Sequence, residues 1–184
     1  MSKKHGKITA DLGDLLSRSN DLEKLNYFAV YDHGKGGEDS VGVTYAYLGD
    51  HAKMDNRLSE IDIAIIEKKS NKAILLIEIE ESGDNPKKII GAAMATLLAD
   101  GLSLKSGQKL AIGSPTTLMV LAKGEGDEHK KRIQTIETRM KQLISIEGFN
   151  KEMKIEMINL ELYQDPAFLP EKIITYLLSH PQMS

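Results

Sequence analysis

The chain has 184 residues, of which 41% are hydrophobic, and its formal net charge is −3. This length allows one domain with a buried core and is too short for two ordinary domains, so residues 1–184 are expected to form a single domain. The absence of cysteine excludes disulfides and thiolate-bound zinc, and the negative charge disfavours a general nucleic-acid coat, which must neutralise many phosphates.

The basic start of the chain, residues 1–7, is followed by an amphipathic stretch and lacks the apolar run of a signal peptide. No apolar run in the sequence approaches the roughly 20 residues that are needed to span a bilayer. The sequence therefore predicts a cytoplasmic protein that has no membrane partner.

The first third of the chain combines a helical pattern with two strand patterns. Leucine and isoleucine recur at helical spacing over residues 8–25, with a break near Asn20. Residues 27–31 and 41–48 are rich in aromatic and β-branched side chains, which favours strands. The glycine-rich residues 34–37 between them predict a turn.

A polar, aperiodic loop at residues 49–59 leads into two apolar segments, 60–68 and 72–81, which we expect to form a strand hairpin. In the next helix, Asn85 suits the N-cap and Pro86 the first helical position, and Gly101 is a suitable end.

The rest of the chain alternates strands and helices. The expected elements are a strand at 110–122 interrupted near Ser114 and Pro115, a helix at 127–144, a strand at 153–162 with a bulge, and a closing helix at 167–178. This order predicts an α/β domain with a central mixed β-sheet flanked by helices.

Three acids interrupt the apolar hairpin segments: Asp62 in the first segment, and Glu78 and Glu80 in the second. A carboxylate in a low-dielectric interior must be paired, neutralised or bound to a metal. The apolar stretches that carry them, residues 61–66 and 74–80, contain no cation. The three acids therefore suggest a site for a divalent metal ion.

Whether the acids meet depends on the register of the hairpin, because strand side chains alternate between faces. A two-residue loop at 70–71 would place Asp62 opposite Ile79, on the wrong face. A three-residue loop at 69–71 would place Asp62 opposite Glu78. The metal site therefore requires the odd loop or a β-bulge.

This pattern, an acid followed after 15 residues by acid-x-acid and then by a helix, resembles the PD-(D/E)XK nuclease superfamily, also called restriction endonuclease-like. The resemblance covers residues 58–101 and implies a three-layer fold in which Asp62 and Glu78 bind magnesium. Glu80 occupies the position where that superfamily usually has lysine. The superfamily often draws a further acid from the N-terminal helix, and Glu23 is the nearest match.

The resemblance implies a metal-dependent endonuclease that hydrolyses the phosphodiester bonds of DNA. Mg²⁺ would be the cofactor, with Mn²⁺ as a substitute and Asp62, Glu78 and Glu80 as metal ligands, and double-strand cutting would call for a homodimer. The missing lysine leaves a second reading open, a catalytically inactive nuclease-like module that binds nucleic acid or a partner. A third is an unrelated α/β protein with an acidic surface patch.

Several basic residues are candidates for contacts with phosphate. Lys87 and Lys88 follow the acids and could take the catalytic role of the missing lysine, although the start of a helix disfavours cations and a solvated turn is the alternative. The others, which are ordinary surface residues in the alternative reading, are Arg57, Lys130, Lys131 and Arg132.

Overall fold

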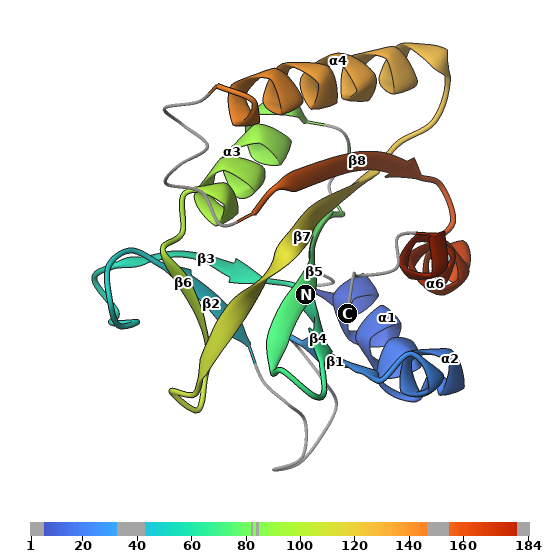
Figure 1. The fold of residues 1–184 in the computed structure, drawn as a ribbon. Helices are drawn as coiled ribbons and strands as arrows, with labels where there is room; N and C mark the ends of the chain where they lie inside the picture. Colours follow the sequence, from blue (N-terminus) through green and yellow to red (C-terminus); the bar gives the residue numbers. More distant parts are fainter. Residues whose placement is uncertain (1–5, 33–42, 82, 84, 147–154, 180–184) are drawn as a thin grey trace, which may run out of the picture.

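The computed structural model describes residues 6–32, 43–81, 83, 85–146 and 155–179. The glycine-rich turn predicted at 34–37 lies outside these residues. Figure 1 shows the order of the elements along the chain.

The described residues form helices on both sides of a sheet. The helices are α1 (Lys7–Ser17), α2 (Asn20–Lys24), α3 (Pro86–Leu97), α4 (Asp127–Ile144), the 3-10 turn η1 (Pro166–Phe168) and α6 (Leu169–Ser179). The strands are β1 (Tyr27–Tyr31), β2 (Thr44–Tyr47), β3 (Arg57–Ile61), β4 (Ile63–Glu67), β5 (Lys72–Glu80), β6 (Gly101–Leu104), β7 (Lys109–Lys123) and β8 (Met157–Tyr163).

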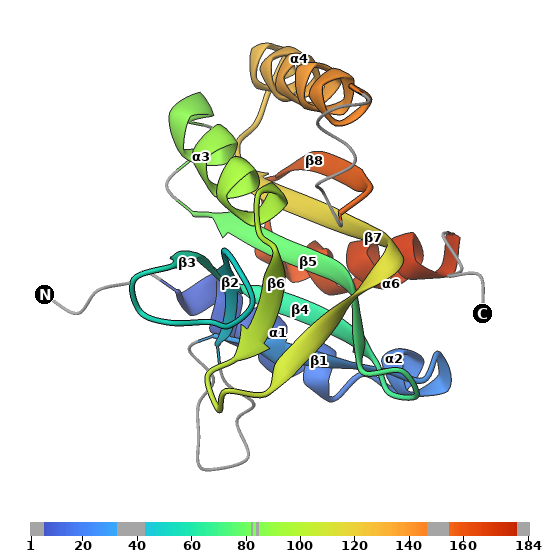
Figure 2. The same ribbon diagram turned by 60° about the vertical axis from the view of Figure 1, so that its left-hand side comes forward.

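The strands form one mixed sheet in the order β1-β4-β5-β7-β6-β2-β3, with β8 paired to β7 beside this path. Strand β7 joins the two halves of the sheet, because its first part pairs with β6 and its last part lies between β5 and β8. Strands β5, β7 and β8 are parallel, so their carboxyl ends reach the same edge of the sheet (Figure 2).

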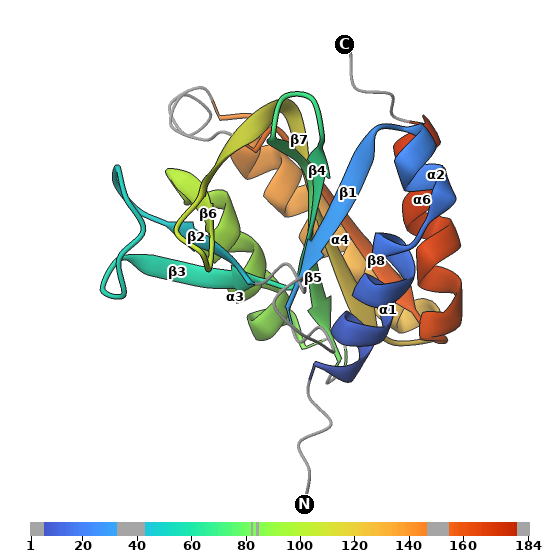
Figure 3. The same cartoon turned by 90° about the horizontal axis from the view of Figure 1, so that it is seen from below.

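Helices cover both faces of the sheet, with α1, α2 and α6 on one side and α3 and α4 on the other (Figure 3). Alternation along β5 divides the core in the same way: Leu76 packs toward α3 and α4, and Ile77 toward α1 and α6. Each fully buried side chain of this size contributes about 1.5–3 kcal/mol. The prediction of an α/β domain with a mixed sheet between helices is confirmed.

Local sequence signals fix several element ends. The predicted break in the first helix occurs at Ser19, whose hydroxyl accepts hydrogen bonds from two amides of the first turn of α2. Helix α3 begins at Pro86 behind an Asn85 cap, as predicted. Helix α4 spans the predicted range, 127–144.

Two strands differ from the sequence prediction. Strand β3 begins at Arg57, inside the predicted loop, and β6 begins at Gly101, which we expected to end α3. A side chain at Gly101 would meet the Tyr47 hydroxyl at 2.6 Å, so close packing between β6 and β2 explains the glycine. The predicted strand at 153–162 is described only from residue 155 and forms β8 from Met157. Its pairing with β7 is in continuous register from Met157 to Tyr163, so the predicted bulge is wrong for the described residues.

Among the described residues, the helices are too short or too polar for any of them to cross a membrane.

Candidate functional site

The three predicted acids lie at one edge of the sheet. Asp62 joins β3 to β4, and Glu78 and Glu80 lie at the end of β5. The carboxyl ends of β7 and β8 reach the same edge. In open α/β sheets, ligands bind at the carboxyl ends of the strands.

The hairpin between β4 and β5 brings Asp62 next to Glu78. Ile63 pairs with Ile77, and Asp62 and Glu78 each lie one residue further toward the edge. The loop spans the four residues 68–71, so of the two arrangements that the site requires, the odd loop is not the one formed. A β-bulge midway along the hairpin shifts the register by one residue. The bulge, the other arrangement compatible with the site, therefore places Asp62 and Glu78 at adjacent positions of the two strands.

The carboxylate of Asp62 is held by two donors from different elements. The Thr9 hydroxyl on α1 donates to Oδ1 at 3.0 Å, and the Ile79 amide donates to Oδ2 at 2.7 Å. Burial raises the pKa of Asp62 to about 6, and the charges of Asp32 and Glu81 act in the same direction. The two hydrogen bonds stabilise the ionised form and limit this rise.

Glu78 is more deeply buried, with 7% of its surface exposed. Its Oε1 accepts a hydrogen bond of 2.7 Å from the Thr96 hydroxyl on α3, and that hydroxyl lies 3.0 Å from the Ser59 hydroxyl on β3. Burial raises the pKa of Glu78 well above its ordinary value, and the nearby charge of Asp62 raises it further. The Thr96 hydrogen bond opposes both effects.

Glu78 is buried and Asp62 is half-buried, and the described residues provide neither carboxylate with a cationic partner. No lysine, arginine or histidine of the described residues lies within 4 Å of either carboxylate. A divalent cation would offset this charge, and oxygen ligands suit Mg²⁺. The donor chemistry therefore fits the predicted ion.

The ligand set itself stays a prediction. The described part of the chain contains no cluster of three or more acidic or histidine side chains with the spacing of a metal site.

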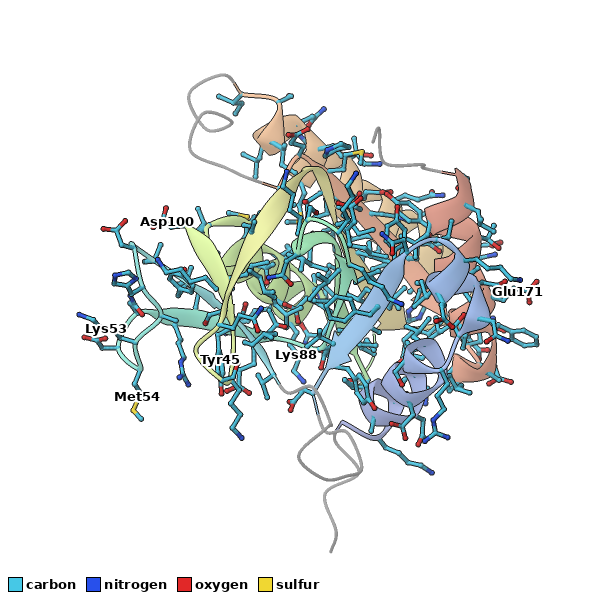
Figure 4. The ribbon with its side chains drawn as sticks, turned by 60° about the horizontal axis from the view of Figure 1, so that its bottom comes forward. Tyr45, Lys53, Met54, Lys88, Asp100 and Glu171 are labelled. Carbon is cyan, nitrogen blue, oxygen red and sulfur yellow. The ribbon has the colours of Figure 1, made fainter. Side chains whose placement is uncertain are left out.

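Glu80 has a different environment from the other two acids. Its Oε1 lies 3.7 Å from the Lys88 ammonium, and the two side chains are 17% and 53% exposed. This contact explains a lysine in the first turn of α3, where the helix dipole alone disfavours a cation. Lys87 is exposed, and its amide bonds to the Asn85 cap. The structure thus places Lys88, which is labelled in Figure 4, beside Glu80.

The other predicted phosphate contacts are distributed over the surface. Arg57 lies at the opposite end of β3 from Asp62, with its guanidinium carbon 3.7 Å from the centroid of the Tyr45 ring. Lys130, in the first turns of α4, lines a pocket of about 320 Å³ together with Tyr163 at the end of β8. Lys131 and Arg132 are exposed on α4. DNA binding by these four residues stays a prediction.

The hydroxyl groups that hold the acids were not predicted from the sequence. No acidic or basic motif contains Thr9, Ser59 or Thr96. Of these three residues, Thr96 alone has a sequence signal, which is its helical spacing. Thr96 lies seven residues after the buried Ile89 and is fully buried itself, so it is a polar residue within an apolar stripe. Glu23, the acid expected from the N-terminal helical region, is exposed on α2, and Thr9 is what this region contributes to Asp62.

Comparison with protein families, with curated proteins and with solved structures found no significant match to this chain.

Replacing Thr96 by valine is expected to destabilise the cation-free protein by about 1–3 kcal/mol at a pH where Glu78 is ionised, because the carboxylate then loses its donor. The loss should shrink as the pH falls and Glu78 takes up a proton. Urea unfolding at several pH values measures this dependence. Thr96→Ser, which keeps the hydroxyl, should show a loss that does not change with pH, and the same flat profile in Thr96→Val would contradict the assignment.

Proposed function

We propose that this chain is a metal-dependent nuclease of the restriction endonuclease-like type that hydrolyses phosphodiester bonds of DNA. The observation that carries the proposal is the adjacency of Asp62 and Glu78, a half-buried and a buried carboxylate at neighbouring strand positions, at the carboxyl edge of a parallel strand set. Such an arrangement is unfavourable unless a cation is bound or a proton is shared.

The arrangement of elements supports the same proposal. Strand β4 begins after Asp62, and the returning strand β5 ends with Glu78 and Glu80. Helix α3 comes next, and strand β7, which is parallel to β5, comes later in the chain. The sheet lies between two layers of helices, which is compatible with the three-layer fold that the resemblance implies.

Phosphodiester hydrolysis needs an activated water, stabilisation of the charge on phosphorus and relief of the leaving alkoxide. A bound Mg²⁺ can supply all three kinds of assistance. In the proposed site Asp62 and Glu78 hold the cation. The Thr9 hydroxyl and the Ile79 amide orient Asp62, and the Thr96 hydroxyl orients Glu78.

In the proposed reaction Lys88 takes the place of the missing lysine. Its ammonium group lies beside Glu80, so it brings a positive charge to the strand position that carries lysine in the superfamily. There it would favour the approach of a phosphate and the developing negative charge of the transition state.

The second candidate is a nuclease-like module that binds DNA or a partner without cutting. The specific observation in its favour is the contact between Glu80 and Lys88, because the acid offsets the positive charge that the lysine would bring to a phosphate.

Cleavage assays separate the two candidates. Supercoiled plasmid and branched DNA are incubated with the protein in Mg²⁺ or Mn²⁺, with Asp62→Asn and Glu78→Gln as controls. Cutting by the wild type that both variants lose supports the nuclease. Binding of the same DNA without any cutting in either ion would favour the module.

Lys88→Ala is expected to lower the cleavage rate by roughly 10–100-fold, on the scale of one lost transition-state contact, and to change stability by less than about 1 kcal/mol. Lys87→Ala removes a neighbouring exposed lysine that contacts neither acid and is the matched control. Rates for both variants at saturating DNA test the assignment, and equal rates for Lys88→Ala and Lys87→Ala would exclude a special role for Lys88.

A further inference from the structure

Tyr163, the last residue of β8, has a buried hydroxyl without a hydrogen-bond partner among the described residues. Only 5% of its surface is exposed, and its ring packs in the core beneath α1 and α6. An unsatisfied buried polar group costs about 1–3 kcal/mol. A hydrogen-bond partner from outside the described residues would remove this cost.

The register of the parallel strands places Tyr163 at the same edge as the acids. Tyr163 pairs with Lys123 on β7, and the preceding residue of β7, Ala122, pairs with Glu80 on β5. Tyr163 therefore lies one residue beyond the row of Glu80, while the Lys123 side chain between them is exposed.

Three acids at this edge influence the hydroxyl without hydrogen-bonding to it. Burial raises the pKa of Tyr163 to about 12, and the charges of Glu81, Glu80 and Asp62 contribute to the rise in that order. Glu81 is fixed on the side of α1, because its Oε1 accepts a hydrogen bond of 3.1 Å from the Ile8 amide. The hydroxyl stays protonated at neutral pH and can both donate and accept.

We infer that Tyr163 is a positioning residue of the cation site, whose hydroxyl hydrogen-bonds to water that accompanies a divalent cation held by Asp62 and Glu78. The inference rests on the proposed function. Mg²⁺ gives up its waters reluctantly, so a site with few protein ligands retains several of them. A neutral hydroxyl near the carboxylates suits such water, and residues that support metal ligands in this way affect metal affinity.

The chain is well suited to an optical test, because it has six tyrosines and no tryptophan. Tb³⁺ bound near a tyrosine emits light when the tyrosine is excited. Tyr163→Phe removes the hydroxyl alone. Tyr27→Phe is the matched control, because Tyr27 is also buried but pairs with Glu67 at the far end of its strand.

We expect Tyr163→Phe to lose most of the tyrosine-sensitised Tb³⁺ emission and to bind Mn²⁺ roughly tenfold more weakly by calorimetry. Tyr27→Phe should match the wild type in both measurements. Without cations, Tyr163→Phe should unfold at the same temperature as the wild type or higher, because an unsatisfied hydroxyl has been removed. Added Mn²⁺ should then stabilise it less than the wild type.

The Mn²⁺ affinity decides the inference. An affinity of Tyr163→Phe equal to that of the wild type overturns it, whatever the emission, and leaves the proposed nuclease standing as long as Asp62→Asn still loses binding. A wild type that binds no Mn²⁺, or binding that persists in Asp62→Asn, overturns the proposed cation site and this inference together.

Discussion

Asp62→Asn and Glu78→Gln are each expected to abolish detectable Mg²⁺ binding and to lower DNA cleavage by about 10³-fold or more. The magnitude follows from the several kcal/mol of transition-state stabilisation that a catalytic cation provides. Both amides keep an oxygen that can accept the hydrogen bonds of the Ile79 amide and the Thr96 hydroxyl, so the surrounding structure should persist.

Calorimetric titration with Mg²⁺ and Mn²⁺, followed by plasmid cleavage with the same samples, measures both effects. Glu60→Gln is the matched control, because Glu60 is an exposed acid two residues before Asp62. It should bind and cleave as the wild type does. Binding that survives in Asp62→Asn and Glu78→Gln would leave the acids as a structural pair and remove the basis of the proposed function.

The cation-free wild type is expected to become more stable as the pH falls from 8 toward 5. The folded protein holds a proton on Asp62 with a pKa of about 6, against an ordinary value of 3.8. Between these values the folded state binds more protons than the unfolded chain, so the free energy of unfolding falls as the pH rises. Above pH 6 the ionised Asp62 destabilises the fold by up to ~3 kcal/mol. Glu78, whose pKa is also raised, extends the effect to higher pH.

Asp62→Asn should therefore be more stable than the wild type at pH 8 without cations, by about 1–3 kcal/mol, which corresponds to roughly 5 °C in Tm. The difference should disappear near pH 4. Thermal unfolding in a chelator at several pH values measures it. Mg²⁺ at about 100 times its Kd should add ~2.7 kcal/mol to the wild type only. A wild type that is more stable than Asp62→Asn in the chelator at pH 8 would contradict the raised pKa.

The sequence predicted elements well where a local signal marks them. Ser19 and Asn85 are caps, and the apolar spacing of α4 fixes a long amphipathic helix. Strand β6 was missed because a run of four residues is too short for its alternation to stand out, and the strand forms through pairing with β2 and β7. Non-local pairing of this kind is set by tertiary structure, which a local pattern does not report.

The acids of the candidate site could be predicted from the sequence, but the residues that hydrogen-bond to them could not. Carboxylates in an apolar strand stand out because their burial is unfavourable, so Asp62 and Glu78 could be found from sequence. Threonines are ordinary in strands and helices, so the roles of Thr9 and Thr96 depend on elements brought together by the fold. The contact between Lys88 and Glu80 likewise depends on the orientation of α3 relative to β5.

The bulged hairpin has a consequence for how similar sites could be found in other chains. In a hairpin, every cross-strand pair adds two residues, one from each strand, to the segment between two facing acids. Whether the total number of residues between the acids is odd or even is therefore decided by the residues of the loop and of any bulge. The four-residue loop and the single bulge residue make it odd here, as a three-residue loop without a bulge would. Spacings longer or shorter by two residues would serve equally well, whereas the loss of one residue would turn Glu78 toward α1 and α6. Geometry therefore requires an odd number of residues between the two acids, but it does not fix how large that number is.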